Sequence, residues 1–379
     1  MELRFKSVPL QHSHKNENAS EKPESESAFA SACRKNVNEY FKEKGISPKG
    51  NTALVIKSVA MFSFYIIPFL LILTVSMPWW VALILSAVIG VGIAGLGMGV
   101  MHDACHGASS NKEWLNNLLG GTMNLLGGSV RTWKMQHNVL HHTYTNIAGG
   151  DGDIAPRWPL RLSENAPIKK VHHYQYIHAF FFYGLMTITR IVNDFKQLSE
   201  FSKSNMTNKF KVNLTKEYFI MAAVKVIYLF VFIGLPIIFT HFSWWQVIIG
   251  FVTMHWVAGF ILSTIFQLAH VVEEVEQPLP DEKGIIYHDW AVHELRTTAD
   301  FARNNRFINW YVGGLNFQIE HHLFPYISHV HYPKIAPIVE RTANEFGLPY
   351  NSMPSFGSAL ASHIRKLKEL GLQNPIKAV

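Results

Sequence analysis

Histidine is the most unusual feature of this sequence, because its 20 histidines nearly equal its 27 acidic residues. Several of them fall into three short clusters, which read HDACH at 102–106, HNVLHH at 137–142 and QIEHH at 318–322, while His270 stands apart. Histidine is the commonest metal ligand among protein side chains. The clusters therefore predict a metal site, and no catalytic residue is predicted outside that metal centre.

The spacing within each cluster suits a helix. Residues four apart lie on one helical face, which places His102 beside His106 and His137 beside His141. The third cluster has the same property at steps of three and four residues. His142 differs, because it points about 100° away from His141 on a regular helix. We therefore expect His142 to serve a second metal ion or to require a local bend.

The candidate ligands are the clustered histidines, the isolated histidine and the amide that opens the third cluster. They are His102, His106, His137, His141, His142, His270, His321, His322 and Gln318. Gln318 is an open case, because an amide oxygen is a poor iron ligand and can act through a hydrogen bond instead. A single zinc ion takes about four ligands, so this supply predicts two metal ions. Imidazole suits iron, zinc, copper and nickel alike, and ligand type alone does not choose among them.

A second group of polar residues lies within or just after the clusters. These residues are Asp103, Asn146, Asp151, Asp153 and Glu320. Metal-bound imidazoles usually donate their other N–H to such a group, so each is a candidate for orienting a ligand. Each also fits an ordinary surface or capping role.

Four long apolar stretches must position these clusters. They cover residues 52–75, 79–101, 218–239 and 244–269. Each has about the twenty residues that a helix needs to cross a bilayer, and only Lys57 and Lys225 add charge. Short gaps pair them as two hairpins. The sequence thus predicts an all-α integral membrane protein, in preference to a large soluble protein whose core contains four buried apolar helices.

The loops predict an orientation. Neither hairpin turn contains Lys or Arg, so the positive-inside rule places both termini and the ends that carry the histidines in the cytoplasm. Trp79, Trp80, Trp244 and Trp245 flank the turns, as an aromatic belt at the outer interface would. Residues 102–217 and 270–379 then form a cytoplasmic helical cap that holds the di-metal site.

Composition narrows the class of protein further. Only 16% of the residues are charged and 13% are aromatic, which excludes a chain disordered throughout. The net charge of +7 fits the inner face of a membrane protein better than nucleic-acid binding. Two cysteines exclude a disulfide framework. Residues 1–50 are polar and are predicted to form a disordered arm, followed by one domain over 51–379.

The three clusters together resemble the histidine boxes of the integral-membrane fatty acid desaturases. The similarity runs from about residue 50 to the C-terminus and includes HHTYTN at 141–146, TTADFARNN at 297–305 and GGLNFQIEHHLFP at 313–325. Glutamine at the start of the third box is typical of the front-end branch, the delta-6, delta-5 and delta-8 enzymes. The closest likeness is to the bacterial linoleoyl-CoA or acyl-lipid delta-6 type.

The resemblance implies a di-iron centre, O₂ as co-substrate and a fatty acyl-CoA or acyl lipid as substrate. The clustered histidines would be its ligands, His270 would be the additional ligand after the last span, and Gln318 replaces a histidine of the third box. Breaking an unactivated C–H bond requires the oxidising power of such a cofactor. The sequence contains no HPGG haem motif of a fused cytochrome b5. The resemblance therefore implies a ferredoxin or a separate cytochrome b5 as electron donor, and a bacterial inner membrane as the location.

Two other functions compete with desaturation. A hydroxylase of alkyl, carotenoid or sphingoid chains would use the same scaffold. A non-enzymatic metal-binding protein or transporter is disfavoured, because His255 is the only histidine within the spans and a transport path needs polar groups at mid-membrane.

Overall fold

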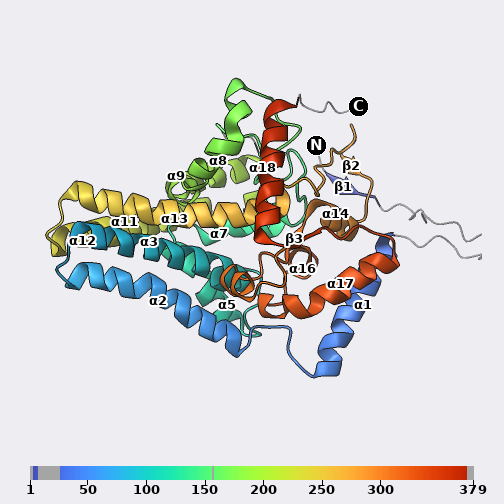
Figure 1. The fold of residues 1–379 in the computed structure, drawn as a ribbon, viewed down its shortest axis with the longest axis horizontal. Helices are drawn as coiled ribbons and strands as arrows, with labels where there is room; N and C mark the ends of the chain where they lie inside the picture. Colours follow the sequence, from blue (N-terminus) through green and yellow to red (C-terminus); the bar gives the residue numbers. More distant parts are fainter. Residues whose placement is uncertain (1–2, 7–25, 156–157, 374–379) are drawn as a thin grey trace, which may run out of the picture. The chain divides into compact units, whose positions relative to one another are not determined.

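The computed structural model describes residues 3–6, 26–155 and 158–373, and most of these residues are helical (Figure 1). They form two compact units. Unit 1 combines residues up to 50 with 136–179 and 265 onward, and unit 2 combines 51–135 with 180–264.

Four helical segments in the described part of the chain are long and apolar enough to cross a membrane. They are Thr52–Thr74, Trp79–Cys105, Leu214–Phe239 and Trp244–His270. The prediction of a helical membrane protein with four spans is therefore confirmed. The second and third spans extend a few residues beyond their predicted ends, and the third begins early because the Asn213 side chain accepts a hydrogen bond from the Lys216 amide and caps the helix.

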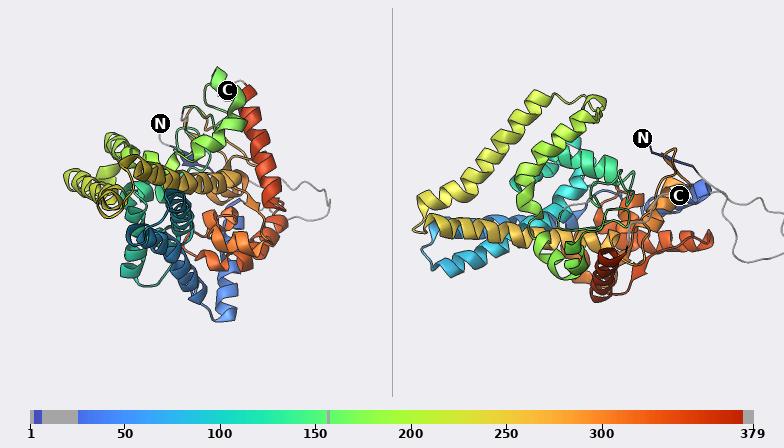
Figure 2. Two further views of the ribbon diagram at one scale, coloured as in Figure 1. Left: turned by 60° about the vertical axis from the view of Figure 1, so that its left-hand side comes forward. Right: turned by 90° about the horizontal axis from the view of Figure 1, so that it is seen from above.

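Unit 2 contains most of the spanning segments and the short helices between them. Its elements are α2 (Thr52–Thr74), α3 (Trp79–Gly95), the π-helix η1 (Leu96–Met101), α4 (His102–Cys105), α5 (Glu113–Gly120), α6 (Thr122–Leu125), α7 (Val130–Lys134), α9 (Met186–Lys203), α10 (Met206–Lys209), α11 (Leu214–Leu229), the π-helix η4 (Phe230–Gly234) and α12 (Leu235–Phe239), with most of α13 (Trp244–His270). Helices α2 and α3 lie side by side in all views (Figures 1 and 2). In the right-hand view of Figure 2, α11 diverges from α13 away from the turn that connects them.

Glycines allow the close approach of α2 and α3. A methyl group on Gly92 would lie 2.8 Å from the backbone nitrogen of Tyr65, closer than real side chains pack. Small residues at such crossings let membrane helices pack backbone to backbone. At the turns, the rings of Trp79 and Trp245 are 6.4 Å apart, so both turns lie at the same end of unit 2.

Unit 1 is built from short helices and two pairs of very short strands. Its elements are β1 (Arg4–Phe5), α1 (Glu26–Lys44), the π-helix η2 (Met135–His141), the 3₁₀ helix η3 (Lys170–Tyr174), β2 (Ile285–Ile286), α14 (Trp290–Thr297), β3 (Asp300–Phe301), α15 (Arg306–Tyr311), α16 (Gln318–Leu323), the 3₁₀ helix η5 (His329–His331), α17 (Tyr332–Glu345), β4 (Ser352–Met353) and α18 (Phe356–Leu372), with the last turns of α13. Helix α8 (Gln175–Tyr183) crosses the boundary between the units. The strands pair in parallel, β1 with β2 and β3 with β4.

Helix α1 differs from the prediction of a disordered arm. It packs against α17 and α14. Figure 1 shows α1 beside α17. Its Phe29, Cys33, Val37 and Phe41 are buried in the core of unit 1. These residues recur every four positions, so one apolar stripe on an otherwise polar helix is enough to anchor it. The prediction is wrong for residues 26–44, and the part that covers residues 7–25 lies outside the described residues.

Candidate metal centre

The second histidine cluster lies on a π-helix. The backbone N–H of His142 donates to the carbonyl of His137 at 3.1 Å, which is the five-residue step of a π-turn. The ring nitrogens Nε2 of these two histidines are 3.3 Å apart. The wider turn therefore brings His137, His141 and His142 together, and it supplies the local bend that a regular helix lacks.

Unit 1 gathers six of the eight predicted histidine ligands. The ligand atoms of His141, His270 and His322 lie within 4.8 Å of one another, and so do those of His142, His321 and His322. The rings of His137 and His321 are stacked at 5.8 Å. All six side chains are buried.

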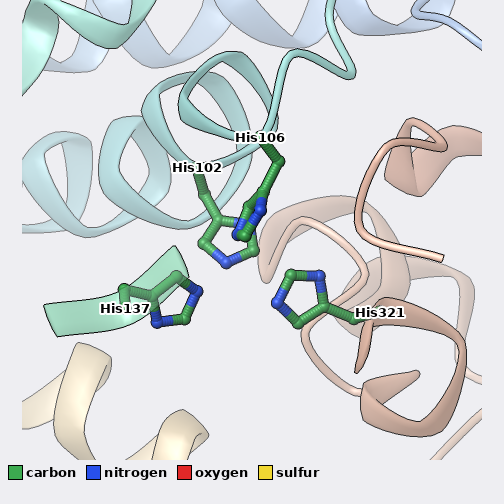
Figure 3. A group of neighbouring side chains, drawn as sticks. All are labelled: His102, His106, His137 and His321. Carbon is green, nitrogen blue, oxygen red and sulfur yellow. The ribbon is translucent and has the colours of Figure 1, made fainter. Parts of the chain in front are cut away.

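The first cluster forms a pair within unit 2. The rings of His102 and His106 are 4.9 Å apart on neighbouring turns, and Trp133 meets both edge-on. Figure 3 shows this pair on one helix, and it also shows His137 and His321 with their rings directed toward each other. Asp103, between the paired histidines in sequence, is buried as well.

Asp151 is hydrogen-bonded to His141. Its carboxylate lies 3.0 Å from Nδ1 of His141 and also accepts from the backbone N–H of Asn146. Burial alone would lower the pKa of His141, but the charge and hydrogen bond of Asp151 raise it to about 9. Asp153 lies further from the same nitrogen, at 3.7 Å. Because Asp151 occupies Nδ1, the other ring nitrogen of His141, Nε2, remains available to bind a metal ion.

Glu294 is hydrogen-bonded to His322, and no sequence pattern predicts this contact. Its carboxylate lies 2.7 Å from Nδ1 of His322 and accepts a hydrogen bond of 2.8 Å from the Thr145 hydroxyl. Burial raises the pKa of Glu294 to about 8, against the opposing effect of the Thr145 hydrogen bond. Glu294 precedes His322 by 28 positions and lies outside every cluster, so no local spacing pointed to it.

Asn146 connects the loop after the second cluster to the end of α13. Its Nδ2 donates to the carbonyl of His270 at 2.8 Å and to that of Thr297 at 3.2 Å. The residue adopts a φ of 58°, the left-handed conformation that asparagine tolerates better than most side chains. Asn146 therefore acts on backbone near the site and not on an imidazole nitrogen.

Helix α16 carries the third cluster, which also contains the candidates Glu320 and Gln318. The surroundings of these two side chains differ from those of the histidines. Glu320 accepts a hydrogen bond of 2.9 Å from the Tyr350 hydroxyl, which also contacts Asp300, so this carboxylate faces a separate buried network. Burial raises the pKa of Glu320 well above its usual value. Gln318 is buried, and its Oε1 has no hydrogen-bond partner among the described residues.

The unsatisfied nitrogens in this cluster fit metal ions. Among the described residues, Nε2 of His141 and both ring nitrogens of His270 are buried without a hydrogen-bond partner. Leaving a buried polar atom unsatisfied costs about 1–3 kcal/mol, and a metal ion bound to such nitrogens removes that cost. The chain is thus a mostly helical membrane protein whose buried histidines could hold metal ions.

Comparison with known proteins identifies the family. The fatty acid desaturase family model matches residues 78–354, nearly three quarters of the chain, and includes all the histidine clusters. The chain belongs to the fatty acid desaturase family, and it is an oxidoreductase.

Curated relatives match over nearly the whole chain. The sn-1 linoleoyl-lipid 6-desaturase of Arthrospira platensis is 34% identical over 93% of this chain and 95% of its own length. The protein of the same name from Synechocystis sp. is also 34% identical, over 90% of this chain and 95% of its own. The acyl-lipid (8-3)-desaturase of Physcomitrium patens is 34% identical over 91% of this chain and 72% of its own.

Proposed function

We propose that this chain introduces a double bond at carbon 6 of a fatty acyl chain carried on a membrane lipid. The observation that carries the proposal is the match, over more than nine tenths of both chains, to a relative named as a linoleoyl-lipid 6-desaturase. Gln318 at the head of the third box supports the same front-end assignment. The new double bond would lie between the carboxyl end and the existing one.

The metal centre would contain two iron ions bound by the eight predicted histidines. The six imidazoles gathered in unit 1 and the pair in unit 2 support this ligand set. Two irons with O₂ would supply the oxidising power needed to remove hydrogen from an unactivated methylene. Gln318 is proposed as a residue beside the centre and not as a ligand, because an amide oxygen is a weaker ligand for iron than imidazole.

The protein's own groups would keep the imidazoles in place. Asp151 and Glu294 each hold the Nδ1 side of one histidine, so that Nε2 remains directed at the metal. Complete burial of both carboxylates excludes water from these hydrogen bonds. In the overall reaction two hydrogens leave adjacent carbons, and O₂ becomes two water molecules with two protons and two outside electrons.

The electron donor would be a separate protein, either a ferredoxin or a cytochrome b5. We propose that the donor acts in the cytoplasm and that the spans lie in a bacterial inner membrane. The absence of Lys and Arg from the two turns supports that orientation.

Expression in a host supplied with linoleate and a compatible donor tests the proposal. Gas chromatography of the fatty acids should reveal an 18-carbon chain with an additional double bond at carbon 6. A hydroxylated chain would instead identify a hydroxylase on the same scaffold, and a new bond beyond the existing ones would contradict the front-end assignment.

A further inference from the structure

Helix α15 presents an apolar face to solvent although it belongs to unit 1, outside the spanning segments. Phe307 is 70% exposed and Trp310 is 37% exposed. Together with Tyr311, whose ring stacks on Phe307 at 6.2 Å, they occupy positions i, i+3 and i+4 and therefore share one side of the helix. Arg306 is exposed next to them. We call these four residues the α15 face.

Hydrogen bonds connect helix α15 to the end of a spanning helix. The backbone N–H of Ala299 donates to the carbonyl of Ala269, in the last turn of α13, at 3.0 Å. Phe301 follows two residues later, roughly 7 Å along an extended chain. Asn316 donates to the carbonyl of Phe301 at 2.9 Å and to the side chain of Asn309, in the middle of α15, at 2.7 Å. A short chain of hydrogen bonds therefore ties α15 to the end of α13.

Helix α13 is longer than the hydrocarbon core of a membrane is thick. The helix has 27 residues, which corresponds to about 40 Å. The hydrocarbon core is only about 30 Å thick, so the terminal turns extend into the headgroup region. Hydrogen bonds tie α15 to this end of the helix, and the headgroup level is where aromatic side chains with basic neighbours are most favourable.

We propose that the α15 face is inserted into the headgroup region of the membrane, with Phe307 and Trp310 among the upper acyl carbons and Arg306 beside lipid phosphates. The occupant is a lipid surface, because the face combines apolar rings with a cation and continues the interface already occupied by α13. If this face were exposed to water, its apolar rings would contribute no free energy of burial to stability.

The position of α15 has a consequence for substrate access, which rests on the proposed function. The chain passes from α15 through Gly313 and Gly314, both with positive φ, into α16 and the third histidine cluster. Glycine tolerates this conformation without strain. Tyr311, the last residue of the α15 face, precedes His321 by ten residues. A lipid bound at this face would therefore deliver its acyl chain beside the segment that leads into the third histidine cluster.

Spin-label accessibility tests the insertion directly. A nitroxide is attached at Phe307→Cys, and a control label at Lys35→Cys, whose native side chain is 73% exposed on α1. Cys33 and Cys105 are buried, and burial raises the pKa of Cys33 to about 12, so neither should compete for the label. In lipid nanodiscs the label at 307 should be relaxed more by O₂ than by a water-soluble nickel complex, with the reverse at 35. Equal nickel accessibility at the two positions would overturn the proposal.

Kinetics separate membrane insertion from the proposed reaction. The double variant F307S/W310S should raise the KM for a lipid-linked substrate in vesicles several-fold while kcat is kept. Tyr287→Ser is the matched control, since Tyr287 is 47% exposed but hydrogen-bonded to Asp281. An unchanged KM would contradict the access role. If no lipid-linked substrate is turned over, the proposed function fails, and the label at 307 still decides the insertion.

Discussion

Two buried carboxylates explain how the histidines of unit 1 keep a defined orientation. Asp151 holds His141 and Glu294 holds His322, each through Nδ1. The opposite ring nitrogen of each histidine is thereby directed to the common cluster. Partners of this kind fix the tautomer and the ring orientation of a metal-binding histidine.

Replacement of Glu294 by Gln should weaken metal binding about 10–100-fold, the usual effect of losing such a partner. The amide keeps the size of the side chain but is a weaker acceptor than a carboxyl group for the hydrogen bond to His322 Nδ1. Iron content after titration with a chelator measures the change. Glu276→Gln is the control, because Glu276 is a partly exposed carboxylate paired with Arg296. Equal iron retention in both variants would contradict this role of Glu294.

The sequence was informative about histidines and less so about their partners. Spacing within a cluster predicts which imidazoles share a face, and Asp151 follows the second cluster closely enough to be considered. Glu294 reaches the site only through tertiary folding, so no local pattern reveals it. Glu320 shows the converse, because it lies within a cluster but turns toward Tyr350.

At the scale of elements, one buried ion pair fixes the segment that leads into the second cluster. Asp194 on α9 pairs with Lys225 on α11 at 2.8 Å. The same carboxylate accepts from the backbone N–H of Ser129, the residue that caps α7, at 2.9 Å. Lys225 also donates to the carbonyl of Gly127 at 3.0 Å. Both sides of the turn before α7 are therefore held by this pair.

Replacement of Lys225 by Met should destabilise the protein by about 3–5 kcal/mol, because it leaves the Asp194 carboxylate buried without its main counter-charge. The double variant D194L/K225M should lose less than K225M alone, since no buried charge is then left uncompensated. Unfolding in detergent micelles measures both. A double variant less stable than K225M would show that the hydrogen bonds to the α7 turn, and not the charges, dominate.

Helix α1 should contribute to stability through its buried stripe. Phe29→Ala removes a fully buried ring and should cost about 3–5 kcal/mol. Lys35→Ala on the exposed side of the same helix should change stability by less than about 0.5 kcal/mol. Thermal unfolding of the two variants provides the comparison, and equal midpoints would mean that α1 is not anchored in the core.

Element prediction succeeded where hydrophobicity was continuous and failed where it was sparse. The four spans follow from long apolar runs with few charged residues, and such runs have few alternative structures. Helix α1 buries only about one residue in four. Its mostly polar composition therefore predicted disorder, although the apolar stripe is enough to anchor a helix. The π-turn at His137–His142 depends on backbone geometry near the site, and the sequence showed only that a regular helix would separate His141 from His142.

For the whole molecule, the arrangement of charge predicts the orientation in the membrane. A phosphatase reporter that is active only outside the cytoplasm should be active when fused within 75–78 or 240–243 and inactive at the C-terminus. Lys and Arg are absent from both turns and frequent in the N-terminal segment, in the segment between the hairpins and in the C-terminal segment. The opposite pattern of reporter activity would reverse the orientation and place the histidines outside the cytoplasm.

The central claim is that buried histidines hold the metal centre of a lipid desaturase that acts at carbon 6. The most direct measurement is the fatty acid profile of cells fed linoleate, compared between the native chain and His141→Ala at matched expression, with iron measured in both purified proteins. We predict a new double bond at carbon 6 and bound iron for the native chain, and neither for the variant. The same product from His141→Ala, or iron-free native protein that still makes it, would contradict the account.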